Sequence, residues 1–233
     1  LDTLQTIHPN NLPEPVRAQY YNLLARCYQE MAELINIPFY NDKYRNLSNL
    51  FFDSAAQLSP KKTVLSTTMN VVLMREKGEL DKASNALRRI LKNPNISLHD
   101  SAIVNSTLGE IFLQKNEIDS AIIFLARAIE NDIKSSTKET AAIIILANLL
   151  FELGDIKNAS TLIRKANEEA VFYGTRLRKI QIAAILPFIE EEVINEIEEQ
   201  KQLLLRRSLI VSALLIAVFI LMIIVYRQLV KLR

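Results

Sequence analysis

The sequence is poor in the residues on which catalytic and metal sites depend. Its 233 residues include no Trp, four Gly, two His and one Cys. Because Cys27 stands alone, neither an intramolecular disulfide nor a thiolate metal site can form within the chain. His8 and His99 lie far apart, and neither has a partner at ligand spacing. The chain also has no Gly-rich phosphate-binding motif. We therefore expect a protein that is not an enzyme and that binds no metal or cofactor.

The charge is also nearly balanced, with 28 basic and 26 acidic residues and a formal net charge of +2. Such a composition gives no reason to expect nucleic-acid binding by this part of the protein. Scarce Gly, together with abundant Ala, Leu, Ile, Lys and Glu, favours helix over sheet.

Three segments of the sequence superimpose at a constant interval of 38 residues. They are GELDKASNAL (78–87), NEIDSAIIFL (116–125) and GDIKNASTLI (154–163). The Gly or Asn that opens each segment suits the left-handed residue that ends a helix, and the next residue is acidic, as helix N-termini favour. Ala83, Ala121 and Ala159 then allow two helices to approach closely. Three units in one register predict an all-α solenoid of helix pairs.

The N-terminal part fits the same pattern less closely. Residues 15–36 and 42–58 read as a pair of amphipathic helices, with residues 35–41, which contain Pro38, as the loop between them. Leu1–Pro9 looks like the end of a further helix, so we expect the solenoid to begin upstream of Leu1.

An uninterrupted apolar run, SLIVSALLIAVFILMIIVY, occupies residues 208–226 without a charge, Pro or Gly. As a helix it would be about 28 Å long, close to the ~30 Å hydrocarbon core of a bilayer. It predicts a membrane span, with a buried core helix as the alternative. Three basic residues lie on each side, so charge does not set the orientation. The sequence thus divides into a repeat domain (1–174), a helical connector (175–207), a transmembrane helix (208–226) and the start of a truncated helix (227–233).

The connector carries two further signals. Pro187 should kink or break a helix and is a candidate hinge, so we expect one continuous helix from about Phe188 to Arg233. Val193, Ile197 and Leu204 form a short, weak heptad pattern. Together with small-residue pairs such as Ser208 and Ser212 inside the span, this pattern leaves a homodimer possible.

The repeat pattern resembles the tetratricopeptide repeat (TPR), with residues 102–133 as the best unit. Residues 166–190 (ANEEAVFYGTRLRKIQIAAILPFIE), followed by an acidic helix and a span, resemble membrane-spanning tetratricopeptide regulators of Bacteroidota, of the starch-utilisation type. LPEPVRAQYYNLLARCYQEMAE and DSAAQLSP are also similar to the repeats of that family. The resemblance implies a periplasmic solenoid, one span in the inner membrane, and a DNA-binding domain beyond Arg233.

Three functions remain open on these grounds. The first is the extracytoplasmic sensor and membrane anchor of a single-pass transcriptional regulator, controlling polysaccharide or glycan utilisation, as the resemblance implies. The second is a tail-anchored adaptor that recruits proteins at a membrane, and the third is the sensor half of a membrane kinase. The effector would be a protein, a peptide or an oligosaccharide.

In solenoids of this kind the first helix of each pair lines the concave surface. Its outward positions nominate a set of binding residues: Arg75, Ser106, Glu110, Asn148 and Phe151. Four tyrosines, Tyr20, Tyr21, Tyr40 and Tyr44, could also stack on sugar rings. We favour packing between helices as their role.

Overall fold

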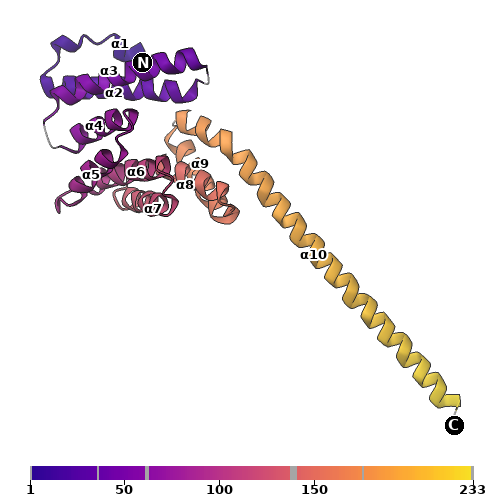
Figure 1. The fold of residues 1–233 in the computed structure, drawn as a ribbon. Coiled ribbons are helices and arrows are strands. Elements are labelled where there is room, and N and C mark those ends of the chain that lie inside the picture. The colour runs from indigo at the N-terminus through magenta and orange to yellow at the C-terminus, as the bar shows by residue number, and fades with distance from the viewer. Residues whose placement is uncertain (1, 36, 61–62, 137–140, 175, 232–233) are drawn as a thin grey trace. The chain divides into compact units, whose positions relative to one another are not determined.

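The computed structural model describes residues 2–35, 37–60, 63–136, 141–174 and 176–231, and all regular structure within these ranges is helical. The helices are α1 (Asp2–Gln5), η1 (Pro9–Asn11), α2 (Glu14–Leu34), α3 (Pro38–Leu58), α4 (Val64–Glu76), α5 (Leu80–Leu91), α6 (Leu98–Gln114), α7 (Ile118–Lys134), α8 (Ala141–Glu152), α9 (Ile156–Tyr173) and α10 (Arg176–Lys231) (Figure 1). The chain forms two units, Leu1–Leu146 and Ala147–Arg233, and α8 lies across their boundary. The all-α prediction is confirmed.

The predicted helix ends lie where the repeat places them. Gly78, Asn116 and Gly154 follow α4, α6 and α8 and have positive φ angles of 73°, 59° and 81°. In each case the acidic residue that follows is the N-cap of the next helix. The backbone hydrogen bonds are also equivalent: Glu79 N–H donates to Met74 O, Glu117 to Phe112 O and Asp155 to Leu150 O, each at 2.9 Å. These are Schellman caps, which satisfy carbonyls at the end of a helix.

Each cap is followed by a small residue at a close helix contact. Ala83, Ala121 and Ala159 are fully buried on α5, α7 and α9. Another close contact in the repeats joins α6 and α7, where Gly109 faces Leu125. A Cβ placed on Gly109 would lie 2.6 Å from Leu125 Cγ, and Leu125 itself is fully buried. The Leu-Gly position of the repeat is therefore a packing requirement.

The N-terminal pair α2 and α3 packs along its length, and one loop prediction is wrong there. We expected residues 35–41 to connect the helices, but α3 begins at Pro38. Proline suits the first position of a helix, because its fixed φ is already helical and its missing N–H would have no partner there. The Asn41 side-chain amide, on the first turn of α3, donates to the Ala32 carbonyl at 2.7 Å and holds the tight connection.

The prediction of a helix break at Pro187 is also wrong. α10 starts at Arg176, well before Phe188, and continues through Pro187 without interruption (Figure 1). Pro187 is exposed, while Ile182 and Ile189 on either side of it are buried where α10 packs against α9. Packing on both sides keeps the helix continuous, although proline removes one hydrogen bond from the helix interior.

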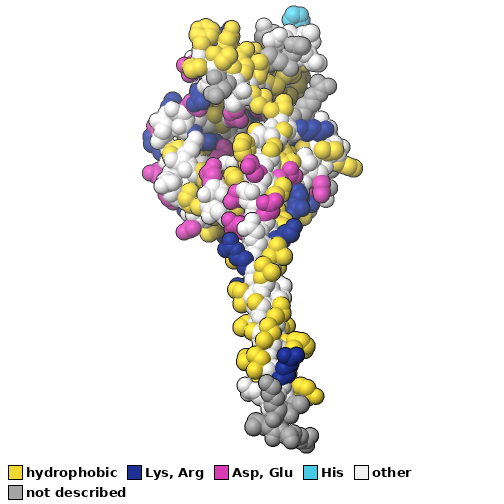
Figure 2. All heavy atoms as spheres, turned by 90° about the vertical axis from the view of Figure 1, so that its right-hand side faces the viewer, with side chains coloured by type: hydrophobic (Ala, Val, Ile, Leu, Met, Phe, Trp, Pro, Cys, Tyr) yellow, Lys and Arg dark blue, Asp and Glu magenta, His cyan; other side chains and the backbone are white. Residues whose placement is uncertain are grey.

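Beyond Ile189, no described residue of α10 is buried. Its C-terminal part is long and apolar enough to cross a membrane by length and composition, and its most apolar stretch is fully exposed. Figure 2 shows hydrophobic side chains along this part of the helix, and the exposed large residues run from Leu209 to Tyr226. The helix that contains the predicted span is thus a candidate membrane span.

We expect Gly109→Ala to destabilise the protein by about 1 kcal/mol, because overpacking at Leu125 (~1–3 kcal/mol) outweighs the better helix propensity of Ala (up to ~1 kcal/mol). In a Leu125→Ala background the same change should be neutral or stabilising, since the obstructing side chain is gone. Urea unfolding of the four proteins of this cycle measures the coupling. Equal effects of Gly109→Ala in both backgrounds would show that the close contact does not matter.

Candidate functional site

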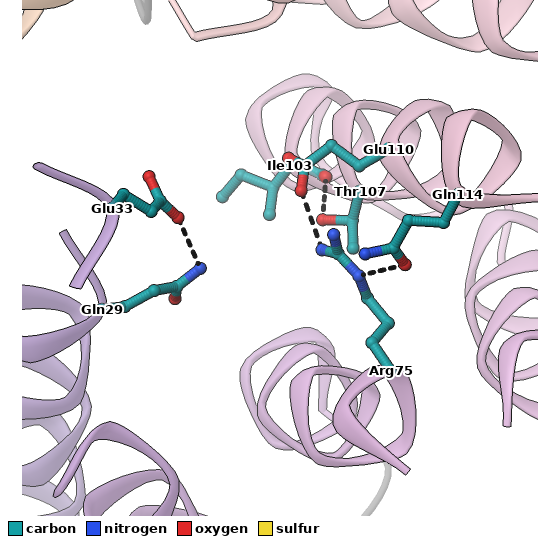
Figure 3. Close-up of polar contacts among 7 residues, drawn as sticks. All are labelled: Gln29, Glu33, Arg75, Ile103, Thr107, Glu110 and Gln114. Atoms are coloured by element: carbon teal, nitrogen blue, oxygen red, sulfur yellow. Dashed lines mark hydrogen bonds and ion pairs between the residues drawn. The ribbon is translucent and has the colours of Figure 1, made fainter. Parts of the chain in front are cut away.

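A polar cluster joins the first helices of two successive repeats, α4 and α6 (Figure 3). Arg75 Nη1 donates to Glu110 Oε2 at 2.8 Å, and Arg75 Nε donates to Gln114 Oε1 at 3.1 Å. The pair is partly shielded from water, with 18% of the Arg75 side chain and 33% of the Glu110 side chain exposed. Figure 3 also shows a second polar pair, Gln29 and Glu33 of α2, joined at 3.2 Å.

The structure therefore brings together two of the predicted binding residues, which face each other. An ion pair of this exposure contributes on the order of 1 kcal/mol, and here it links neighbouring repeats. Arg75 donates two hydrogen bonds, to Glu110 and Gln114, and these give it a structural role between the repeats. A role for Arg75 and Glu110 in ligand binding stays a prediction.

The other three predicted residues make fewer contacts. Ser106 is half-buried, one turn before Glu110 on the same face of α6. Asn148 and Phe151 belong to the second unit, where both are half-buried and Asn148 Nδ2 donates to Glu152 Oε1 at 2.9 Å within α8. Their predicted binding role likewise remains a prediction.

A row of stacked aromatic rings runs along α2 and α3. The stacked pairs are Tyr21–Phe51, Tyr28–Phe51, Tyr28–Tyr44 and Tyr40–Tyr44, with ring centroids 6.0, 5.6, 6.0 and 6.4 Å apart. Tyr20 meets Tyr21 edge to face at 5.5 Å. The four tyrosines that we considered for sugar stacking thus pack against rings of their own helix pair. Such contacts contribute about 0.5–1.5 kcal/mol each beyond burial.

One end of this row also lines an open pocket of about 430 Å³. The lining residues are Gln5, Ile7, His8, Pro9, Tyr20, Tyr21, Leu24, Tyr28 and Phe51. Tyr20 Oη donates to the Leu4 carbonyl at 3.1 Å and so attaches the N-terminal segment to α2. The pocket combines ring faces with an amide, an imidazole and tyrosine hydroxyls, which is the usual chemistry of a small-molecule site.

Sequence reasoning missed the part of this pocket that the N-terminal segment supplies. His8 looked like an isolated loop residue, but it lines the pocket beside Gln5 and Pro9. No spacing rule marks such residues, because they meet Tyr21 and Tyr28 only when the segment folds back onto α2. Of the proposed sugar-stacking tyrosines, Tyr20 and Tyr21 line the pocket.

Lys115, which follows α6, forms a second polar cluster in the first unit. Lys115 binds both Glu117, at 2.6 Å, and Asp81, at 3.1 Å. The hydrogen bond to Glu117, and to a smaller extent the one to Asp81, raises the pKa of Lys115 above its ordinary value. The Lys115 ammonium and the Arg88 guanidinium also lie over the Phe112 ring, at 5.4 and 5.3 Å from its centroid. Among the described residues, no group of three or more His, Cys, Asp or Glu side chains is placed to hold a metal ion.

Comparison with known proteins places this helical architecture in a family. No curated protein sequence matches the chain. The family model described as the SusR N-terminal TPR domain matches residues 1–184, which include all the repeats, the aromatic pocket and the start of α10. The match covers well over half of the chain, and it agrees with the resemblance seen in the sequence. The chain therefore belongs to the family of SusR N-terminal TPR domains.

Proposed function

We propose that this chain is the extracytoplasmic sensor and membrane anchor of a single-pass transcriptional regulator of glycan utilisation. One observation carries the proposal: a SusR-type TPR domain continues without a break into a helix with an exposed apolar stretch long enough to span a membrane. An aqueous solenoid of this kind binds effectors, and a helix continuous with it is a direct mechanical route across the bilayer. DNA contact would belong to another part of the regulator.

The aromatic pocket is the site we propose for the glycan. Pyranose rings present flat faces of C–H groups, which pack on aromatic rings, and hydroxyls, which need donors and acceptors at the rim. Tyr21 and Tyr28 are half-buried and stack on Phe51, so that their rings are held in place before a ligand arrives. Such preorganisation lowers the entropic cost of binding. Gln5 and His8 supply polar groups beside the rings.

Transmission would pass through α10. A glycan shifts a conformational equilibrium only by the difference between its affinities for the two states. Within the second unit, α10 packs against α9 near Ile182 and Ile189. Beyond Ile189 the described residues of α10 are not buried, up to and including the candidate span. A movement of α9 would therefore be passed along α10, which is one continuous helix, to the candidate span.

A tail-anchored adaptor remains the second candidate, since the basic residues on the two sides of the span balance. A membrane kinase sensor would share the same solenoid and span. No described arrangement supports catalysis by this chain in either case, and we propose that it is not an enzyme.

We expect Tyr28→Leu to weaken glycan binding at least about tenfold, a loss of about 1.4 kcal/mol, because it removes an aromatic ring and its hydroxyl from the pocket lining and keeps an apolar side chain. The measurement is calorimetric titration of the full chain in nanodiscs with α- and β-linked glucose oligosaccharides of two to seven units. Circular dichroism melting would confirm that the variant is folded.

Two variants serve as controls for the position of the site. Phe39→Leu removes an exposed ring outside the pocket and should leave the affinity unchanged. Arg75→Gln should also leave it unchanged. A loss confined to Arg75→Gln would move the site to the α4–α6 surface, and absence of binding by every glycan would reject a glycan effector.

The orientation can be tested by cysteine labelling, because the chain has only Cys27. In a Cys27→Ala background, Asn46→Cys on exposed α3 should react in intact cells with a maleimide that does not cross the inner membrane. Gln228→Cys, just beyond the span, should react only after lysis. The reverse pattern would establish the cytosolic adaptor.

Pro187→Ala should restore a helix hydrogen bond and stiffen α10, since an interior proline costs about 3 kcal/mol. We therefore expect changed basal transcription of the target operon in cells that carry the full-length regulator. Ala184→Ser, at a nearby exposed position, is the matched control. If basal and induced transcription both keep their wild-type levels, Pro187 has no hinge function.

A further inference from the structure

The face of α10 that α9 covers continues beyond the point where α9 stops covering it. Ile182 and Ile189 are 1% and 0% exposed. At spacings of four and seven, the same face continues as Val193, Ile197 and Leu204, which are apolar as well. Here Ile197 and Leu204 are 59% and 65% exposed. We call these last three residues the α10 seam.

Most of the remaining residues of this stretch are polar, while Ile194, Leu203 and Leu205 are exposed apolar residues outside the seam. The opposite face carries Glu191, Asn195, Glu198 and Gln202, all exposed. Glu190 and Arg207 lie on the same side of the helix as the seam, one before it and one after it. Their charges limit the length of the seam. An apolar stripe of this kind on a helix in water is typical of a surface that another helix covers.

A second copy of the same helix fits this stripe by its charges. This argument rests on the proposed membrane anchoring, because two copies anchored by the same span must lie parallel. In a parallel pair with Val193 and Leu204 facing the partner, Glu196 flanks one side of the seam and Lys201 the other. These positions are five residues apart, the spacing at which a residue of one helix meets the flank of its partner in a parallel coiled coil. Each Glu196 would then face the Lys201 of the other copy, giving two symmetric pairs of opposite charge.

We propose that the α10 seam is a homodimer interface, at which two copies of this chain pair in parallel just outside the membrane. The seam is too short to hold two soluble chains together, since isolated coiled coils need three to four heptads. Confinement to one membrane raises the effective concentration of the partner and makes a short seam sufficient. The pair would join the two membrane helices, so that an effector bound to one solenoid acts on both.

Disulfide cross-linking in native membranes tests this interface. In the Cys27→Ala background, Ile197→Cys and Leu204→Cys should form dimers on mild oxidation. Asn195→Cys and Gln202→Cys, also seven residues apart but on the opposite face, are the matched controls. We expect cross-linking at least about fivefold faster at the seam than at the controls, because only a and d positions of a parallel pair approach closely. Equal rates at all four positions, or none at the seam, would overturn the proposal.

A charge exchange tests the register without relying on the two control positions. Glu196→Lys and Lys201→Glu, each added to Ile197→Cys, should slow cross-linking because like charges then face each other. The double variant carrying both changes should restore the rate. Failure of the double variant to recover would reject the parallel register.

The result can be separated from that of the proposed function. Alkaline extraction of the membranes shows whether the chain is anchored, and maleimide labelling shows its orientation. An anchored chain with a cytosolic solenoid would reject the sensor role and leave the cross-linking test intact. An anchored chain without cross-links at the seam would reject the dimer alone.

Discussion

The fold depends on a repeated constraint: one residue that leaves a helix in the left-handed conformation, followed by a second helix that comes close to the first. At Gly78, Asn116 and Gly154 the chain reverses through equivalent backbone hydrogen bonds. Because the turns are equivalent, Ala83, Ala121 and Ala159 arrive at equivalent depths and are fully buried. A larger residue at these positions would push the helices apart and change the angle between successive repeats.

This constraint also decides which polar groups meet. Equal spacing of the repeats places Arg75 of α4 opposite Glu110 of α6, although they are far apart in the sequence. Both residues are positioned by helices whose ends the caps define. The surface nominated for ligand binding is thus partly neutralised by its own contacts, whereas the pocket near Tyr28 is lined by aromatic rings together with Gln5 and His8. This contrast is the physical reason for proposing the pocket as the effector site.

α10 contains both a segment that packs against α9 and the candidate membrane span. Its N-terminal part packs against α9 through the buried Ile182 and Ile189, and residues 208–226 are uncharged and all exposed. Pro187 lies within the held part, so the lost hydrogen bond is tolerated because side-chain burial on both sides outweighs it. The apolar face of α10 is buried at Ile182 and Ile189 and exposed at Ile197 and Leu204, further along the helix. The α9-packed segment and the candidate span therefore belong to one continuous helix.

The sequence by itself determined the features that arise from neighbouring residues. Cap glycines, acidic N-caps, buried alanines and the apolar run act within one helix or one turn, so their pattern is readable without coordinates. The sequence-based predictions were wrong at Pro38 and Pro187. Proline begins helix α3 at position 38 but lies inside helix α10 at position 187. The residues that pack against each helix decide between these outcomes. Only the tertiary structure closed the pocket around Tyr21, Tyr28 and His8 and paired Arg75 with Glu110. The repeat register placed Arg75 and Glu110 on the same surface but did not show that their side chains pair, and the pocket residues come from segments outside that register, which meet only when the N-terminal segment packs on α2.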